Sequence, residues 1–128
     1  MSKVVLDASA LLALLNNEPG AETLSLRLLA QGVVSTVNLA EVQSRLVNAG
    51  IEPSAAWQAA TTPVSEIAPF TADQAKIAGS LTALTRALGL SLGDRACLAL
   101  AIERRAPVYT ADRSWKKLQV GISIHLIR

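Results

Sequence analysis

Cysteine, aromatic residues and long apolar runs are scarce in this chain of 128 residues, and each shortage excludes a class of protein. The single cysteine, Cys97, rules out an intramolecular disulfide. No apolar run reaches the roughly 20 residues that a membrane-spanning helix needs. No charged-then-apolar leader pattern is visible near the start of the sequence. We therefore expect a cytoplasmic protein that makes no membrane contact.

Two common kinds of enzyme site are also missing from the sequence. The segment Gly89-Leu90-Ser91-Leu92-Gly93 has neither the spacing nor the lysine of a phosphate-binding loop. Cys97 lies in an apolar run, and the only histidine, His125, lies far along the chain without a pattern that defines a cysteine nucleophile pair. We expect structural roles for both residues.

Small aliphatic residues supply most of the apolar surface. Hydrophobic residues make up 51% of the chain but aromatic residues only 3%, and the mean hydropathy is +0.36. Apolar surface beyond what one small core can bury tends to be covered by another subunit. The composition therefore predicts a homodimer or a permanent partner.

The formal net charge of +2 conceals an asymmetry between the two halves of the chain. Residues 1–64 carry 3 basic and 5 acidic groups, whereas residues 65–128 carry 9 basic and 5 acidic groups. Arg95, Arg113 and Lys116 stand close in sequence to acidic residues, which makes them candidates for contacts to substrate phosphates. Solvated helix faces would give the same pattern, so that alternative stays open.

Short apolar runs alternate with helical patterns along the whole chain. This alternation predicts an α/β fold in one domain, residues 1–128, with a central mostly parallel sheet of about four to five strands and helices on both faces. The expected strands are residues 3–7, 33–36, 64–69, 107–110 and 122–127. The expected helices are residues 8–16, 21–31, 38–49, 54–61, 72–88, 91–102 and 114–118.

Four carboxylates fall where such a sheet would gather them at one edge. Asp7 closes the first strand and Asp112 follows the strand at residues 107–110, while Glu41 and Asp94 stand near helix starts. Clustered carboxylates repel one another and need a cation to stay ionised together. Oxygen ligands without cysteine or histidine suit Mg²⁺ or Mn²⁺ rather than zinc. The pattern predicts a phosphodiester-cleaving site with a divalent metal ion.

Each acid also has a purely structural interpretation. Asp7 and Asp112 are placed to cap the helices that follow them. Glu41 and Asp94 are placed as the third residue of a capping box, and Glu41 has Arg45 one turn further on as an ion-pair partner. Taken singly, these roles need no metal. They do not explain why all four acids would meet at the same edge.

In this order, these residues resemble the PIN-domain family, in particular the small VapC-type toxin nucleases. The likeness covers essentially the whole chain. The last motif has Ala111 where many relatives carry asparagine. The motifs that carry the resemblance are Val5-Leu6-Asp7-Ala8-Ser9-Ala10, Asn38-Leu39-Ala40-Glu41-Val42, Leu92-Gly93-Asp94 and Thr110-Ala111-Asp112.

The resemblance implies a metal-dependent endoribonuclease that is the toxin of a type II toxin–antitoxin pair. Such toxins are usually homodimers that a DNA-binding VapB-type antitoxin neutralises. By similarity, Asp7, Asp94 and Asp112 would bind Mg²⁺ or Mn²⁺, and Ser9 and Thr110 would supply hydroxyls to position water, metal or phosphate. The catalytic set that the resemblance implies is Asp7, Glu41, Asp94 and Asp112.

Two other classes of protein compete with this interpretation. A phosphoacceptor receiver domain would need an aspartate at the end of a central strand, and the expected strand at residues 64–69 offers only Glu66. A catalytically inert PIN-like module would use the acidic rim to bind a cationic segment of a partner. The sequence disfavours the first class and leaves the second open.

Overall fold

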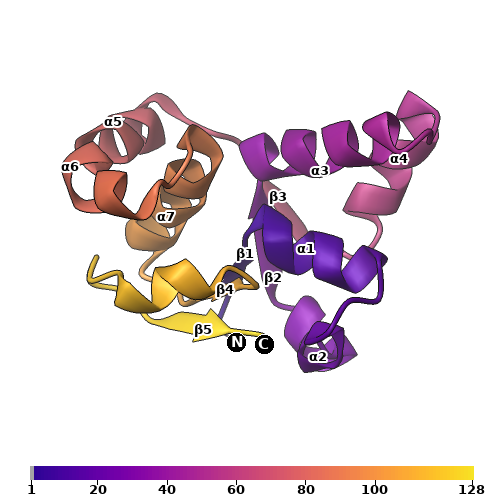
Figure 1. Ribbon diagram of the computed structural model, residues 1–128, viewed down its shortest axis with the longest axis horizontal. Helices are drawn as coiled ribbons and strands as arrows, with labels where there is room; N and C mark the ends of the chain where they lie inside the picture. The colour runs from indigo at the N-terminus through magenta and orange to yellow at the C-terminus, as the bar shows by residue number, and fades with distance from the viewer. Residues whose placement is uncertain (1) are drawn as a thin grey trace.

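Five short strands lie side by side in one sheet, and all of them run in the same direction (Figure 1). The computed structural model describes residues 2–128. The order of the strands across the sheet is β3-β2-β1-β4-β5, which confirms the predicted α/β fold with a parallel sheet. The strands are β1 (Val4–Leu6), β2 (Gly32–Ser35), β3 (Glu66–Ala68), β4 (Val108–Thr110) and β5 (Ile124–Leu126).

The path of the chain across the sheet reverses at β1. From β1 the chain moves outward through β2 to β3, and it then returns to the other side of β1 to form β4 and β5. In open parallel sheets such a reversal leaves a crevice at the carboxyl ends of the two strands, because the connections leave them in opposite directions. Asp7 follows β1 and Asp112 lies just beyond β4, so the fold brings both acids to this crevice.

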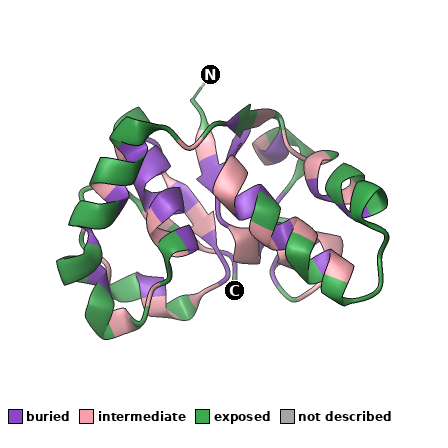
Figure 2. Ribbon diagram, turned by 90° about the horizontal axis from the view of Figure 1, so that it is seen from above, coloured by how far each residue is buried: buried purple, intermediate pink, exposed green. Residues whose placement is uncertain are grey.

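Helices cover both faces of the sheet, because successive residues of a buried strand point to opposite faces. Leu6 packs with residues of α1, α3 and α4, whereas its neighbour Val5 packs with residues of α7. Figure 2 shows the buried sides of the helices turned inward and their exposed sides outward. On the first face lie α1 (Ala8–Leu15), α2 (Leu26–Leu29), α3 (Thr36–Asn48) and α4 (Pro53–Thr61). On the second lie α5 (Ala72–Ser80), α6 (Thr82–Thr85) and α7 (Leu92–Arg104).

The prediction of one long helix over residues 72–88 is wrong. The segment divides into α5, α6 and a 3₁₀ turn, η2 (Arg86–Leu88). Arg95 Nη1 donates to Ala78 O and to Thr82 Oγ1, both at 3.1 Å, at the junction between α5 and α6. Thr82 Oγ1 in turn donates to Gly79 O, a side-chain bond that competes with the helical ladder.

The predicted helix over residues 21–31 is also wrong. A 3₁₀ turn, η1 (Ala21–Thr23), precedes the short α2. Leu24 has a non-helical backbone, and Ser25 Oγ accepts from Leu28 N, so α2 begins afresh after Ser25. A third 3₁₀ segment, η3 (Arg113–Lys117), lies where a short basic helix was expected. None of the helices within residues 2–128 is long and apolar enough to cross a membrane.

Candidate active site

Asp7 and Asp112 reach the same edge because β1 and β4 are hydrogen-bonded neighbours. Each acid caps the helical segment that follows it, as the structural interpretation predicted. Asp7 accepts from Ala10 N at the start of α1, and Asp112 accepts from Ser114 N at the start of η3. Capping orients both carboxylates without excluding a second role, since a carboxylate has two oxygens and several lone pairs.

Asp7 is the most buried of the four acids, with only 2% of its surface exposed. Its carboxylate accepts from Ala10 N at 2.8 Å, from Ser9 Oγ at 2.8 Å and from Thr110 Oγ1 at 2.6 Å. Burial nevertheless dominates and raises the pKa of Asp7 to about 6, with a smaller contribution in the same direction from the charge of Asp94. Asp7 is therefore a rigid, fully bonded acid at the base of the site.

Ser9 and Thr110 connect the two strand ends through Asp7. Thr110 Oγ1 accepts from Asp112 N at 3.0 Å, and Ser9 Oγ accepts from Ala111 N at 2.9 Å. Both hydroxyls donate to the Asp7 carboxylate. In this structure they hold the acids in position; a direct contact of either hydroxyl with water, metal or phosphate stays a prediction.

Asp94 forms the capping box that the sequence predicted. Ser91 Oγ accepts from Asp94 N, and Asp94 Oδ2 accepts from Ser91 N at 2.9 Å. For Glu41 the capping interpretation is wrong, because α3 starts at Thr36 with Ser35 as its N-cap and places Glu41 in the second turn. The ion pair with Arg45 does not form within residues 2–128.

Glu41 is instead held by a buried asparagine that links α3 to α7. Asn38 Nδ2 donates to Glu41 Oε1 at 2.8 Å and to Gly93 O at 3.0 Å. A Cβ atom at position 93 would overlap the Glu41 carboxylate, so only glycine allows this approach. Asn38 and Gly93 were noted in sequence motifs without a role. Their function depends on a contact between helices that no local pattern specifies.

The acids influence one another electrostatically. Burial raises the pKa of Glu41, and the charge of Asp94 adds to the increase, while the Asn38 hydrogen bond and Arg45 oppose it. Asp94 also raises the pKa of Asp7. Carboxylates that repel one another at the edge of a sheet favour a bound cation.

The donor set fits a hard divalent cation. Glu41, Asp94 and Asp112 each use one oxygen for hydrogen bonds within the protein, and no donor in the described part of the chain contacts the other oxygen. Within residues 2–128, no group of three or more histidine, cysteine, aspartate or glutamate side chains is gathered closely enough to hold a metal ion. Magnesium keeps several waters and needs only one or two direct carboxylates, so this arrangement suits Mg²⁺ or Mn²⁺.

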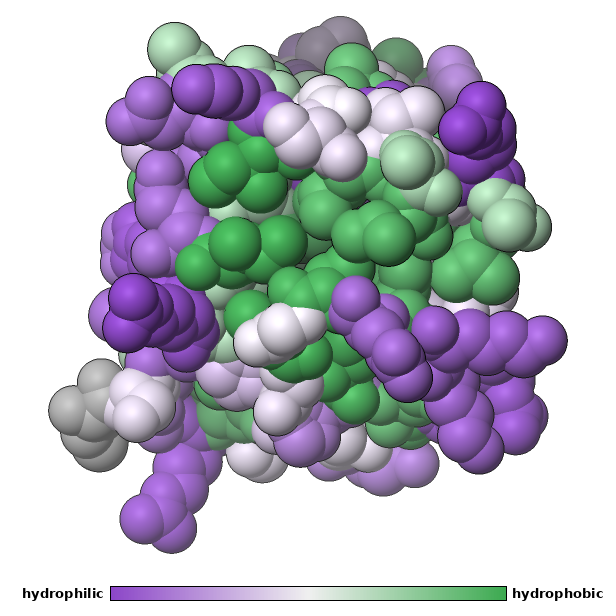
Figure 3. All heavy atoms as spheres, turned by 90° about the vertical axis from the view of Figure 1, so that its left-hand side faces the viewer, coloured by the Kyte–Doolittle hydropathy of each residue, from purple (hydrophilic) through white to green (hydrophobic). Residues whose placement is uncertain are grey.

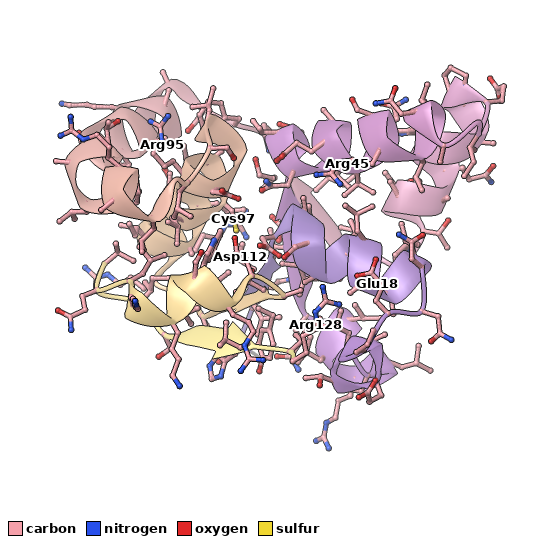
Figure 4. The ribbon with its side chains drawn as sticks, in the orientation of Figure 1. Glu18, Arg45, Arg95, Cys97, Asp112 and Arg128 are labelled. Atoms are coloured by element: carbon pink, nitrogen blue, oxygen red, sulfur yellow. The ribbon has the colours of Figure 1, made fainter. Side chains whose placement is uncertain are left out.

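A cleft of about 390 Å³ opens over these acids. Glu41, Asp94 and Asp112 line it, together with Ser9, whereas Asp7 lies beneath its surface. Figure 4 shows Asp112 at the centre of the molecule, between the helices of the two faces. The cleft is therefore bordered by three of the four predicted catalytic acids and has the fourth at its base.

The basic residues that border the cleft are not those chosen from the sequence. Arg45 and Arg128 line it, and Arg128 Nη1 is bonded to Glu18 Oε1 at 3.0 Å (Figure 4). Arg95 points between α5 and α6 instead, where its guanidinium donates to Ala78 O and Thr82 Oγ1. Two further predicted phosphate contacts, Arg113 and Lys116, are exposed and lie outside the cleft lining.

A small parallel α/β fold with carboxylates at its switch point defines a class of protein in which ligands bind at the strand ends. The family model described as PIN domain matches residues 4–121 of this chain. The chain belongs to the PIN domain family, which confirms the resemblance predicted from the four motifs. A comparison with curated protein sequences gives no match.

Solved structures with the same fold include chains of toxin–antitoxin complexes. A chain of VapBC2 from Rickettsia felis, bound to a DNA fragment from its promoter, has a TM-score of 0.73 at 20% identity, with 94% of this chain and 96% of that chain covered. A chain of DNA-bound VapBC from Salmonella typhimurium has a TM-score of 0.75 at 16% identity, with both chains covered completely (100%). A chain of VapBC-5 from Mycobacterium tuberculosis has a TM-score of 0.60 at 22% identity, with 100% and 99% covered.

Proposed function

We propose that this protein is a metal-dependent endoribonuclease and the toxin of a type II toxin–antitoxin pair. The observation that carries the proposal is the cleft in which Glu41, Asp94 and Asp112 each retain an oxygen without a protein partner, above the buried Asp7. Membership of the PIN family and the likeness to chains of VapBC complexes support it.

In this proposal the ion, Mg²⁺ or Mn²⁺, would be held directly or through water by Asp7, Glu41, Asp94 and Asp112. Such an ion, when bound, stabilises charge on a phosphoryl oxygen and lowers the pKa of water. Asp94 or Asp112 accepts a hydrogen bond from the attacking water and so orients it. Asp7, fixed by Ser9 and Thr110, keeps the two strand ends together. Because water attacks phosphorus and the 3′ oxygen of the ribose leaves, the products carry a 5′-phosphate and a 3′-hydroxyl.

Two partners belong to the proposal. A VapB-type antitoxin would neutralise the nuclease, since the similar structures are toxin–antitoxin complexes. A second copy of the chain would cover the apolar area that Figure 3 shows on one side of the molecule. Among the exposed apolar side chains, Leu84 in α6 is 60% exposed and Leu92 at the start of α7 is 56% exposed, which is costly for two leucines in water.

The test is cleavage of a labelled total RNA pool by the purified, partner-free protein with Mg²⁺ or Mn²⁺ and, in parallel, with EDTA. The proposal expects discrete products that carry 5′-phosphates in the presence of metal and none with EDTA. Absence of cleavage by folded protein under all conditions would contradict it. That result would favour the inert module, and binding of a lysine- and arginine-rich peptide to the acidic rim would then support that alternative.

A further inference from the structure

Asn38 connects the two helices that carry Glu41 and Asp94. It is a residue of α3 with only 1% of its surface exposed. One hydrogen bond from its amide nitrogen ends on Glu41, one helical turn away, and the other ends on the carbonyl of Gly93, next to Asp94 in the first turn of α7. A single side chain therefore links the two helical segments that carry these acids.

The orientation of this amide is set by chemistry. Both partners, a carboxylate and a carbonyl oxygen, are acceptors, so the nitrogen of Asn38 must face them. The amide oxygen consequently points the other way, and this buried atom has no hydrogen-bond partner within residues 2–128. A buried acceptor without a partner lowers stability. A leucine at this position would avoid that cost, so packing alone does not account for the asparagine.

Gly93 leaves room for the Glu41 carboxylate against the first turn of α7. A Cβ atom there would overlap both carboxylate oxygens of Glu41. The Glu41 side chain is long and half-buried, and it lines the same cleft as Asp94. Without the Asn38 hydrogen bond, no other donor within residues 2–128 would hold the Glu41 carboxylate in this position. Asp94 itself is fixed by its capping box.

We infer that Asn38 is a positioning residue whose amide holds the Glu41 carboxylate beside Asp94, so that both can serve the same divalent ion. This inference rests on the proposed function. It assigns a role to a residue outside the set of four acids. It also explains why the stability cost of the bare amide oxygen is retained. Replacing a residue that orients a metal ligand through a hydrogen bond typically weakens metal binding by about 10–100-fold.

The test compares Asn38→Leu and Asn38→Asp with wild type by calorimetric titration of Mn²⁺ into the nuclease in the absence of RNA. Leucine has a branched side chain of similar shape but cannot donate the two hydrogen bonds to Glu41 and Gly93. Aspartate replaces the donor by an acceptor that repels the Glu41 carboxylate and the Gly93 carbonyl. We expect Mn²⁺ binding about tenfold weaker for Asn38→Leu and weaker still for Asn38→Asp. In EDTA, the melting temperature of Asn38→Leu should stay close to that of wild type, because the loss of two hydrogen bonds is offset by removal of the unpaired buried oxygen.

Gln74→Leu is the matched control. Gln74 is a second buried amide, 2% exposed, whose Nε2 donates to Glu103 and whose Oε1 has no partner within residues 2–128. It lies on α5, away from the cleft lining. Its replacement should leave Mn²⁺ affinity and the rate of RNA cleavage unchanged.

With Asn38→Leu, the cleavage rate constant kcat should fall about tenfold while KM for RNA stays unchanged.

The outcomes separate the inference from the proposed function. If wild type binds Mn²⁺, Glu41→Gln weakens binding and Asn38→Leu does not, the role of Asn38 is overturned while the nuclease proposal stands. If wild type neither binds Mn²⁺ nor cleaves RNA, the proposed function fails and the inference fails with it. Weaker binding in both Asn38 variants, with Gln74→Leu at the wild-type value, supports the inference.

Discussion

Thr110 Oγ1 donates to Asp7 Oδ2 at 2.6 Å across 103 positions of sequence. The bond joins the carboxyl ends of β1 and β4, the two strands at which the chain reverses its path across the sheet. The same hydroxyl accepts from Asp112 N. One side chain thus fixes two of the four acids, and the position of the site follows from the order of the strands.

Replacing Thr110 by valine should change the pH dependence of RNA cleavage, because valine keeps the shape of the side chain but cannot donate to Asp7. The Thr110 hydrogen bond lowers the pKa of Asp7, so its loss raises that pKa further. A higher pKa requires a higher pH for ionisation, and the rising limb of the pH–rate profile should move upward. Thr110→Ser should restore the wild-type profile. Thr85→Val is the control, because the buried Thr85 hydroxyl only donates to Leu81 O. A wild-type profile for Thr110→Val would contradict the account.

Asp7 should make the metal-free protein less stable as the pH rises. Its pKa is raised from 3.8 to about 6 in the folded state, so folding favours the protonated acid. The stabilisation that protonated Asp7 provides is therefore fully present below about pH 4. It is lost as the pH rises to about 6, and the loss in the free energy of unfolding is about 3 kcal/mol.

Urea unfolding in EDTA at a series of pH values measures this loss. Asp7→Asn keeps the shape of the side chain and removes its titration, so its stability relative to wild type should increase by about 3 kcal/mol between pH 4 and pH 7. The exposed Glu22 gives the control variant Glu22→Gln. A constant difference between Asp7→Asn and wild type across this range would show that burial of Asp7 does not raise its pKa.

Two glycine-to-alanine substitutions should affect different properties, RNA cleavage in one case and stability in the other. A Cβ at position 93 overlaps the Glu41 carboxylate, so Gly93→Ala should displace that acid and reduce RNA cleavage at least tenfold. Position 79 in α5 has open space around it, so Gly79→Ala should raise the free energy of unfolding by about 0.5–1 kcal/mol and leave cleavage unchanged. Cleavage rates and urea unfolding of both variants check this pair. Full activity of Gly93→Ala would contradict the importance of the Glu41 carboxylate's position against Gly93.

Arg45 and Arg128 should contribute more to RNA binding than the basic residues near η3, because they border the cleft. Fluorescence anisotropy with a non-cleaving Asp94→Asn background measures binding alone. We expect Arg45→Ala to weaken binding and to reduce the slope of affinity against salt concentration by about one phosphate contact. Arg113→Ala and Lys116→Ala should change both quantities less. A larger effect of Arg113→Ala and Lys116→Ala than of Arg45→Ala would instead support the phosphate contacts predicted from the sequence.

The fold and the positions of the acids could be predicted from the sequence, whereas the hydrogen bonds around the acids could not. Short apolar runs that end in aspartate locate the strand ends, and parallel pairing then brings Asp7 and Asp112 together. The bridge from Asn38 to Gly93 and the bond from Arg95 to Ala78 join helices far apart in sequence, so local patterns do not reveal them. The same Arg95 bonds lie at the junction of α5 and α6, within the helix expected over residues 72–88, and direct Arg95 away from the cleft.

The most direct test of the central claim compares the RNA cleavage rates of wild type, Asp94→Asn and Glu22→Gln at saturating Mg²⁺. The asparagine oxygen can still accept from Ser91 N, so Asp94→Asn keeps its helix cap and loses only the charge. The account predicts wild-type cleavage by Glu22→Gln and a loss of at least a hundredfold in Asp94→Asn. Equal rates in all three proteins would contradict an active site built on these carboxylates.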